Sequence, residues 1–361
     1  MYLLLTLALV ILSALFLISL GYRAADHSQF DSPRDPLLIT PEDISANHAA
    51  VIKKLKVFQQ QSGFKIADQR RRMEELFFQE VDAQITPVDV DGVPSEWILA
   101  VNADPNKRLL YLHGGAFRVG SPRTHRYITA ELSRRAGVAV LAIDYRMQPE
   151  FRTIDCHTDA RTAYRWILEN GPEGPSKPNE VYVAGDSAGG NLTLSVIAWA
   201  RDSGQRAANG AIALAPLTDA TMSSPTWASN QKTDPFLGPN IGWLLKLPRT
   251  IVYLVQRLSG GAPPNDPMLS PLLGQLSNLP PILIQASADE MLYGDAQRYA
   301  NKARSAGTDV KLQLWPKMVH VFQGFGPDLP EAKDALERIA DFVKERSKTT
   351  GLSSPEQNDR I

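Results

Sequence analysis

Short apolar runs alternate with amphipathic stretches along most of the chain after residue 96. Apolar runs rich in β-branched residues predict buried strands, whereas apolar residues at helical spacing over ten or more positions predict helices. This alternation is typical of a mostly parallel sheet with helices on both faces, so we expect an α/β fold. Strands are predicted at Trp97–Val101, Arg108–His113, Gly137–Tyr145, Val181–Val183, Gly210–Ala215, Ile282–Ala286 and Val310–Leu314, and helices at Asp159–Glu169, Asn191–Arg201, Asp295–Ser305 and Pro330–Arg346.

Two segments depart from the alternation. The sequence Thr40-Pro41-Glu42-Asp43 has a capping threonine, a proline in the first turn and nearby acids, which predicts a helix start. Helical patterns continue from there to about residue 61, and again over residues 66–81. Between Pro216 and Gly274, prolines and Thr/Ser clusters surround an apolar helix candidate that Pro248 interrupts. We interpret residues 39–85 and 217–274 as elements of a helical cap within a main domain of residues 39–348.

The N-terminal stretch Tyr2–Gly21 carries no charge and is dominated by Leu, Ile, Val and Ala. Its length matches the hydrocarbon core of a bilayer, and no charged residue precedes it as in a secretory signal. We expect residues 1–22 to be a single-pass membrane anchor. A signal cleaved near Ala24, giving a secreted or periplasmic protein, and a buried core helix are the alternatives. Residues 23–38 are predicted to be a linker, and residues 349–361 a disordered tail.

Composition excludes several other classes of protein. The chain has 361 residues, of which 43% are hydrophobic and 21% charged, so it is an ordinary globular chain. The formal net charge of −1 and the absence of a basic stripe argue against a nucleic-acid partner. Cys156 is the single cysteine, which rules out an internal disulfide and a cysteine-built zinc site.

The first candidate for chemistry is the pattern Gly185-x-Ser187-x-Gly189, which falls between a predicted strand and a predicted helix. Glycines on both sides of a serine permit a turn too sharp for larger side chains, and such a turn exposes the hydroxyl. It also directs the N-terminus of the following helix toward any oxyanion that forms beside the serine. Because a glycine-rich turn with an incidental serine gives the same pattern, the case depends on partners elsewhere.

A serine hydroxyl needs a base, and donors for the oxyanion. His320 follows the last predicted strand, where a loop at the carboxyl edge of the sheet would return it to Ser187. The N–H groups of Ala188, and of Gly115 and Ala116 in the loop His113-Gly-Gly-Ala, are candidates for the oxyanion hole.

Several motifs together resemble the hormone-sensitive-lipase-like branch (bacterial family IV) of the α/β-hydrolases. They are His113-Gly-Gly-Ala, Asp144-Tyr-Arg-Met-Gln-Pro-Glu150, Gly185-Asp-Ser-Ala-Gly-Gly190, Asn278-Leu-Pro-Pro281 and Trp315-Pro-Lys-Met-Val-His320. The resemblance implies the α/β-hydrolase fold, a cap domain, a small-molecule ester as substrate, and no cofactor or metal. The chain departs from the family at Ala116, where a third glycine is usual, and after Glu150, where the common proline pattern is missing.

The acid that would orient His320 has two candidates, because Asp289 and Glu290 are adjacent after the strand that ends at Ala286. Counting from Pro281 and matching Leu292 to the leucine common in the family place Glu290 on the acid position. Successive residues point in different directions, so we expect one of the two to reach the histidine. Glu290 is preferred and Asp289 is the alternative, while Asp295 is interpreted as a helix-dipole partner.

These observations predict a serine carboxylesterase that forms an acyl-enzyme on small or short-chain acyl esters. Lactone or arylamide hydrolysis would use the same three residues and differ in the shape of the pocket. A non-catalytic small-molecule receptor on the same fold is the alternative of another class, although a receptor has no need of His320.

Overall fold

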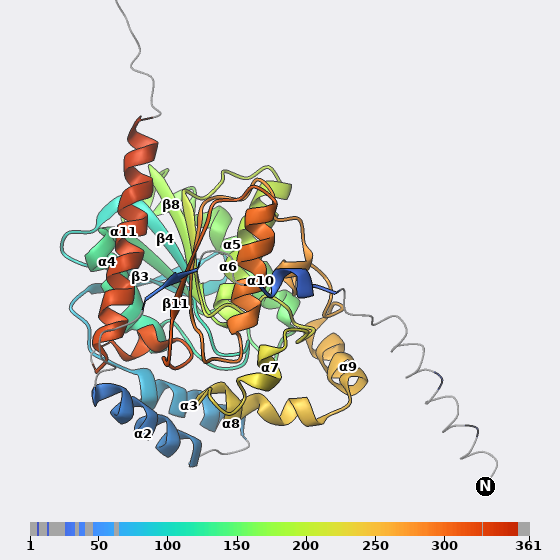
Figure 1. Ribbon diagram of the computed structural model, residues 1–361. Coiled ribbons are helices and arrows are strands. Elements are labelled where there is room, and N and C mark those ends of the chain that lie inside the picture. The colour runs from blue at the N-terminus through green and yellow to red at the C-terminus, as the bar shows by residue number, and fades with distance from the viewer. Residues whose placement is uncertain are drawn as a thin grey trace, which may run out of the picture.

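The centre of the molecule is a nine-stranded sheet (Figure 1). The computed structural model describes residues 26–32, 36–39, 46–60, 65–326 and 328–352, together with Thr6 and Ser13. The order of the strands across the sheet is β1-β11-β10-β9-β8-β4-β5-β3-β2. Their bounds are Leu37–Leu38 (β1), Gln84–Val90 (β2), Val93–Leu99 (β3), Asp104–Leu112 (β4), Val138–Ile143 (β5), Glu180–Asp186 (β8), Gly210–Leu214 (β9), Ile282–Ser287 (β10) and Val310–Trp315 (β11).

The sheet is mostly parallel, as predicted, and each of the seven predicted strands is present. Only β3 pairs antiparallel to its neighbours, β2 and β5, among the described strands of this sheet. The two strands at the edges, β1 and β2, were not predicted. β2 carries Pro87 and is largely exposed, so its apolar pattern is weak, and β1 has only two residues. A minor hairpin of β6 (Asn170–Gly171) and β7 (Gly174–Pro175) lies outside this sheet.

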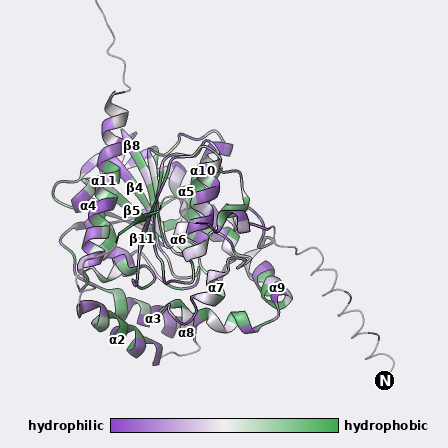
Figure 2. Ribbon diagram, viewed as in Figure 1, coloured by the Kyte–Doolittle hydropathy of each residue, from purple (hydrophilic) through white to green (hydrophobic). Residues whose placement is uncertain are grey.

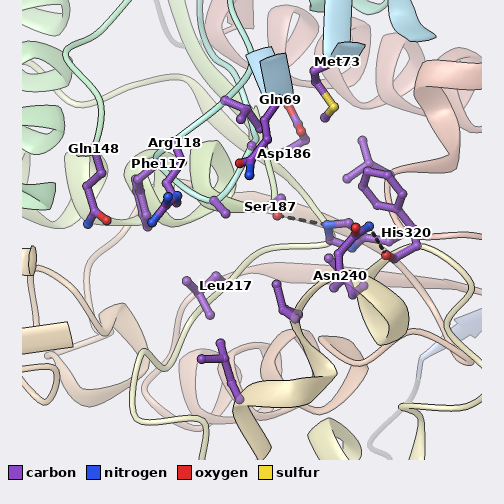
Figure 3. Close-up of a pocket in the computed structure, with 18 of the residues that line it drawn as sticks. Gln69, Met73, Phe117, Arg118, Gln148, Asp186, Ser187, Leu217, Asn240 and His320 are labelled. Atoms are coloured by element: carbon purple, nitrogen blue, oxygen red, sulfur yellow. Dashed lines mark hydrogen bonds between the residues drawn. The ribbon is translucent and has the colours of Figure 1, made fainter. Parts of the chain in front are cut away.

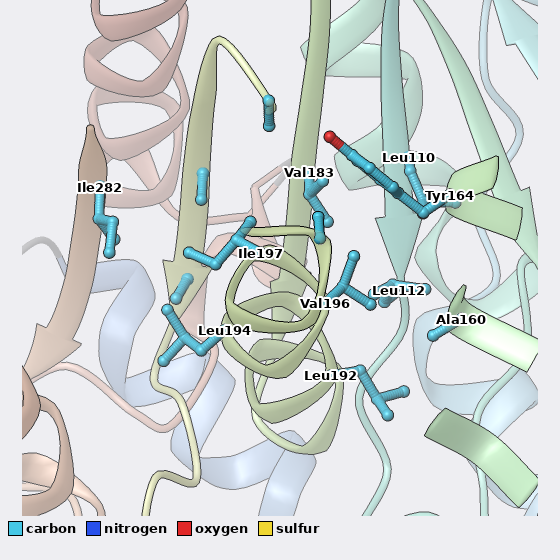
Figure 4. Close-up of a cluster of buried hydrophobic side chains, with 14 of the residues drawn as sticks. Leu110, Leu112, Ala160, Tyr164, Val183, Leu192, Leu194, Val196, Ile197 and Ile282 are labelled. Atoms are coloured by element: carbon cyan, nitrogen blue, oxygen red, sulfur yellow. The ribbon is translucent and has the colours of Figure 1, made fainter. Parts of the chain in front are cut away.

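Helices cover both faces of the sheet, which confirms the expected α/β architecture. Adjacent strand residues divide between two apolar clusters because side chains alternate across a strand. Leu110 and Val183 pack with α5, α6 and α10, whereas Leu109 and Tyr182 pack with α4 and α11. Figure 4 shows α6 lying against the strands on the first of these faces. The bounds are Arg126–Ala136 (α4), Thr153–Ile167 (α5), Ala188–Asp202 (α6), Tyr293–Ser305 (α10) and Pro330–Leu352 (α11).

A further group of helices lies beyond the carboxyl ends of the central strands, and we refer to it as the covering helices (Figure 1). The two sequence segments that form it meet: Gln59 Nε2 donates a hydrogen bond of 2.5 Å to the carbonyl of Pro235, and the rings of Phe77 and Phe236 are 6.4 Å apart. Pro248 separates η3 from α9, as the sequence predicted. The covering helices are α2 (Ala46–Gln60), α3 (Ile66–Phe77), α7 (Thr226–Ser229), α8 (Leu237–Ile241), η3 (Gly242–Lys246) and α9 (Arg249–Gly260).

Part of the predicted linker packs on the domain. The short helix η1 (Ser28–Phe30) contacts α10, where Asp31 forms an ion pair with Arg298 and Asn301 donates to the carbonyls of Phe30 and Ser32. These contacts are polar, which is why a polar composition alone suggested a linker. Figure 2 shows that the strands of the sheet are largely apolar.

The ends of the chain bear on three other predictions. Helix α11 continues to Leu352, so the predicted tail begins too early; residues 353–361 lie outside the described residues. The predicted helix start at residues 40–43 also lies outside them, as does the predicted anchor apart from Thr6 and Ser13. Within the described ranges, no helix has the length and apolarity needed to cross a membrane.

Candidate active site

Ser187 stands at the turn between β8 and α6, in the backbone conformation that the flanking glycines predicted. Its φ of 53° and ψ of −114° are unusual for a residue with a side chain, and they mark a strained turn. A Cβ atom at Gly189 would lie 1.8 Å from the carbonyl oxygen of Leu112, and one at Gly185 would lie 2.4 Å from the carbonyl oxygen of Gly189. The backbone segments therefore approach so closely that only glycine fits at these two positions.

The structure brings Ser187, His320 and Glu290 together in one hydrogen-bonded row. Figure 3 shows the bond between Ser187 and His320. His320 Nε2 lies 2.9 Å from Ser187 Oγ, and His320 Nδ1 contacts Glu290 Oε2. The carboxylate at Nδ1 favours the tautomer with its proton there, which leaves Nε2 free to accept the serine proton. Both His320 and Glu290 are almost fully buried. Glu290 Oε1 accepts a hydrogen bond of 2.8 Å from the Ser287 N–H, which fixes the carboxylate.

Asp289, the alternative acid, is held away from His320. Its Oδ2 accepts a hydrogen bond of 2.5 Å from the N–H of Lys317. Lys317 has a φ of 64°, so Asp289 supports a turn in the loop that carries the histidine. Its side chain thus has a partner of its own, and only Glu290 of the two contacts the imidazole.

The buried pair shifts the protonation of both partners. Burial lowers the pKa of His320, but the Glu290 carboxylate outweighs it, so the pKa of His320 is raised from its ordinary value of 6.5. Burial also raises the pKa of Glu290, against the opposing effect of His320. A base with a raised pKa accepts a proton from serine more readily.

The loop after β4 presents backbone N–H groups beside Ser187. Gly115, Ala116 and Phe117 have φ values of 118°, 54° and 59°, so three successive residues adopt positive φ. A Cβ atom at Gly115 would lie 2.0 Å from the carbonyl oxygen of Val119. Within the described part of the chain, the N–H groups of Gly115, Ala116 and Ala188 have no hydrogen-bond acceptor. Gly115 and Ala116 line the cavity at Ser187, so these donors are available to a ligand.

A buried polar cluster supports this loop, and sequence reasoning missed it. Asp186 accepts hydrogen bonds from Tyr111 Oη at 2.8 Å and from the Gly114 N–H at 3.0 Å, and His125 Nε2 lies 3.3 Å away. Tyr145, from the Asp144–Glu150 motif, donates to the carbonyl of His113 at 2.6 Å. Asp186 lies within the Gly-Asp-Ser motif, so the motif itself signals a carboxylate under the nucleophile.

The cavity at Ser187 has a volume of about 930 Å³ and is mostly apolar. The covering helices form its far wall, with Met73 of α3, Phe236 and Leu244 of residues 217–274, which we call the inserted segment, and Val255 of α9. Figure 3 shows Met73 and Asn240 among the side chains that surround Ser187 and His320. An apolar pocket with a few convergent polar groups is the usual form of a small-molecule site.

One side chain of α6 holds both ends of the inserted segment. The Nδ2 group of Asn191 donates to the carbonyls of Leu217 and Leu269, each at 2.8 Å. The N–H of Leu272 also donates to the carbonyl of Thr218 at 3.0 Å. The two ends of the segment therefore lie side by side, next to the helix that begins at the nucleophile.

Known proteins share this arrangement of fold and site. A family model described as "alpha/beta hydrolase fold" matches residues 109–324. An acetyl-hydrolase of Streptomyces hygroscopicus is 34% identical over 257 residues, which cover 71% of this chain and 81% of the relative. An esterase of Acinetobacter venetianus is 33% identical over 268 residues, which cover 74% of this chain and 84% of the relative.

A solved structure extends the likeness to three dimensions. The crystal structure of an esterase from the bacterial hormone-sensitive lipase family superimposes with a TM-score of 0.74 at 33% identity, and the match covers 84% of this chain and 99% of the other. The chain therefore belongs to the α/β-hydrolase fold family. Within it, the chain is a member of the hormone-sensitive-lipase-like branch, and it is a serine ester hydrolase. This identification leaves no place for the non-catalytic receptor.

Proposed function

We propose that Ser187, His320 and Glu290 are the catalytic triad of this hydrolase and that the reaction passes through an acyl-enzyme. The observation that carries the proposal is the row of contacts from Glu290 through His320 to Ser187 Oγ. Asp289 has no role in proton transfer in this proposal, because its carboxylate is engaged by Lys317.

The first half of the reaction acylates the serine. His320 Nε2 takes the proton of Ser187 as Oγ attacks the ester carbonyl, and a C–O bond forms. The resulting oxyanion accepts hydrogen bonds from the N–H groups of Gly115, Ala116 and Ala188. The imidazolium then returns the proton to the alcohol oxygen as the old ester bond breaks. Glu290 stabilises the imidazolium throughout and stays ionised.

The second half repeats these steps with water. His320 takes a proton from water, the hydroxide attacks the acyl carbonyl, and Ser187 Oγ leaves with the proton that the imidazolium returns. The products are a carboxylic acid and an alcohol. No cofactor enters any step of this sequence.

We further propose that the acyl group is short. The name of the Streptomyces relative, acetyl-hydrolase, supports this choice. The cavity of about 930 Å³ is far larger than an acetyl group, and its apolar walls suit an apolar alcohol moiety. The covering helices would act as the cap that selects this moiety.

Membrane attachment is also proposed, on sequence grounds alone. The uncharged stretch of residues 2–21 is long enough to cross a bilayer. The domain would then lie close to the membrane surface.

Turnover of a panel of esters tests the proposed mechanism. p-Nitrophenyl acetate, butyrate and longer homologues, together with lactones and arylamides, would be compared with wild-type protein and with Ser187→Ala and His320→Ala. Each variant should lose several orders of magnitude in kcat, because members of a triad act as a unit. Near-wild-type turnover in either variant, with an unchanged thermal melt, would show that the triad is wrongly assigned. A preference for lactones or arylamides over the short acyl esters would overturn the substrate class.

A further inference from the structure

The covering helices carry an exposed apolar stripe at the mouth of the cavity. In α9, Ile251, Val255 and Leu258 repeat at helical spacing and are 42%, 55% and 68% exposed. Trp243 of the adjacent η3 is 56% exposed, and both Trp243 and Val255 also line the cavity. A contiguous group of exposed large apolar side chains usually marks a site of interaction with another protein, a ligand or a membrane, whereas scattered single ones do not. Figure 2 shows apolar and polar residues alternating along α9.

The same region lacks negative charge. No Asp or Glu occurs among residues 235–265, whereas Lys246, Arg249 and Arg257 are present and exposed. The whole chain has 39 acidic and 38 basic residues. The lack of acidic residues in this stretch is therefore not a consequence of the overall composition.

Two carboxylates that lie beside the stripe do not cancel this charge. Glu150 and Asp155 lie beside Leu258, at a shallow depression next to the stripe. Glu150 forms a two-pronged pair with Arg70, and Asp155 caps α5 and lies 3.7 Å from Arg146. Each is therefore balanced by an arginine.

The short helix η1 is connected to this region through two neighbouring helices. Helix η1 contacts α10, α10 contacts α7, and α7 contacts η3. Asp26 comes five positions after Gly21 in the chain, a length that reaches at most about 18 Å. An anchor at residues 2–21 would hold this side of the domain near the bilayer.

We propose that η3 and α9 dock on an anionic lipid bilayer, with Trp243, Ile251, Val255 and Leu258 in the headgroup region. Lys246, Arg249 and Arg257 pair with anionic headgroups there. Amphipathic helices with aromatic and basic side chains bind membranes in this orientation, and tryptophan favours the interface. This inference rests on the proposed function, because an ester dissolved in the bilayer would then enter the cavity without crossing water.

Fluorescence of Trp243 tests the docking independently of catalysis. Full-length protein carrying Ser187→Ala would be reconstituted in vesicles of phosphatidylcholine and phosphatidylglycerol in equal amounts, with bromine on the acyl chains. Because the chain has six tryptophans, the signal of Trp243 is the difference between this protein and the same protein with Trp243→Phe. Bromine should quench that difference signal, and the quenching should weaken in vesicles of phosphatidylcholine alone.

Two sets of variants define the surface. Ile251→Ser with Leu258→Ser should reduce the quenching at least about twofold, because these side chains supply buried apolar area. Lys246→Gln with Arg249→Gln should remove the difference between anionic and neutral vesicles. Val101→Ser is the matched control: Val101 is fully exposed but lies in the turn before β4, at the sheet edge opposite Ser187. Thermal melts check that each variant is folded.

The outcomes separate the possible occupants of the stripe. An unquenched Trp243 signal, or one that Ile251→Ser with Leu258→Ser leaves unchanged, overturns the proposal. An unquenched signal with crosslinks between the α9 helices of two molecules assigns the stripe to a second copy instead. In the active background, the same double variant should hydrolyse water-soluble p-nitrophenyl acetate at the wild-type rate and a bilayer-dissolved ester more slowly. Slower hydrolysis of both esters would mean that the double variant disturbs the catalytic site, whether or not the Trp243 signal is quenched.

Discussion

The imidazole of His125 lies 3.3 Å from the carboxylate of Asp186, and the two side chains are buried together directly behind the nucleophile. Burial lowers the pKa of His125, but the Asp186 carboxylate outweighs it, and the pKa of His125 is raised. Burial raises the pKa of Asp186, but His125 and Tyr111 outweigh it, and the pKa of Asp186 is lowered. Asp186 also binds the Gly114 N–H, so the pair connects the nucleophile turn to the loop with the proposed oxyanion donors.

This pair predicts a pH dependence of stability. The contribution of His125 is fully present below its ordinary pKa of about 6.5 and is lost as the pH rises through its raised value. The contribution of Asp186 is present above its ordinary pKa of about 3.9 and is lost as the pH falls through its lowered value. The coupling between them should therefore be largest from about pH 4 to pH 6.5. A double-mutant cycle of His125→Gln and Asp186→Asn, measured by denaturant unfolding from pH 4 to 9, gives this coupling; a flat profile would contradict the ion pair.

The two adjacent acids are expected to differ sharply on substitution. Glu290→Gln should lose roughly 10³ to 10⁴ in turnover, because the imidazole loses the carboxylate that sets its tautomer and stabilises its charged form. Asp289→Asn should lose far less, since the amide oxygen still accepts the Lys317 N–H. Turnover of a short-chain ester gives the comparison, with thermal melting as the control for folding. An inactive Asp289→Asn beside an active Glu290→Gln would make Asp289 the triad acid.

The rate should also follow the protonation of His320. Only the neutral imidazole can accept the serine proton, so kcat/KM should rise with pH through the pKa of His320. That pKa is raised by Glu290, so the midpoint should lie above 6.5. Glu290→Gln removes the carboxylate, and the residual activity should reach its plateau at a lower pH. A pH profile of both proteins on one ester measures the shift, and an upward shift in the variant would contradict the assignment.

Substitutions at Gly189 and at Ala116 should have opposite effects on activity. Gly189→Ala should inactivate the enzyme, because its Cβ would lie 1.8 Å from a backbone oxygen that cannot move without breaking the sheet. Ala116→Gly should keep activity within a few-fold, since glycine adopts the φ of 54° without strain. Its stability should change by no more than about 1 kcal/mol. Steady-state kinetics and denaturant unfolding give both answers; an active Gly189→Ala would mean that the turn is looser than its contacts indicate.

The N-terminal segment offers a graded truncation. Full-length protein should remain with membranes through a carbonate wash, whereas a chain that begins at Asp26 should be soluble and active. A chain that begins at Pro36 loses the ion pair of Asp31 with Arg298 and the bonds from Asn301, so it should melt at a lower temperature than the longer one. A mature N-terminus near Ala24, found by mass spectrometry, would favour the cleaved signal instead of the anchor.

Prediction from the sequence succeeded best for elements that a single physical requirement determines. Buried parallel strands such as β9 and β10 are continuous apolar runs, and the glycines around Ser187 reflect close backbone contacts, so both leave strong local patterns. Interactions between distant residues leave weaker ones. His125 is 61 residues from Asp186 in the chain, and no local pattern around either residue indicates that they meet. For the same reason η1 was taken for a linker, because its partners on α10 are more than 260 residues away.

Asn191 donates hydrogen bonds to both ends of the inserted segment, so the segment leaves and rejoins the main domain at one place. The residues between Leu217 and Leu269 form much of the wall that a substrate meets, and their two covalent connections to the remainder of the fold lie side by side next to α6. A loop whose ends are already held together can change in length at little cost in free energy. Substrate preference can therefore diverge by changes within one contiguous stretch, as long as Asn230 still donates to the carbonyls of Ala288 and Glu290 beside the proposed triad acid. The same boundaries would serve for transplanting the corresponding stretch from a related esterase.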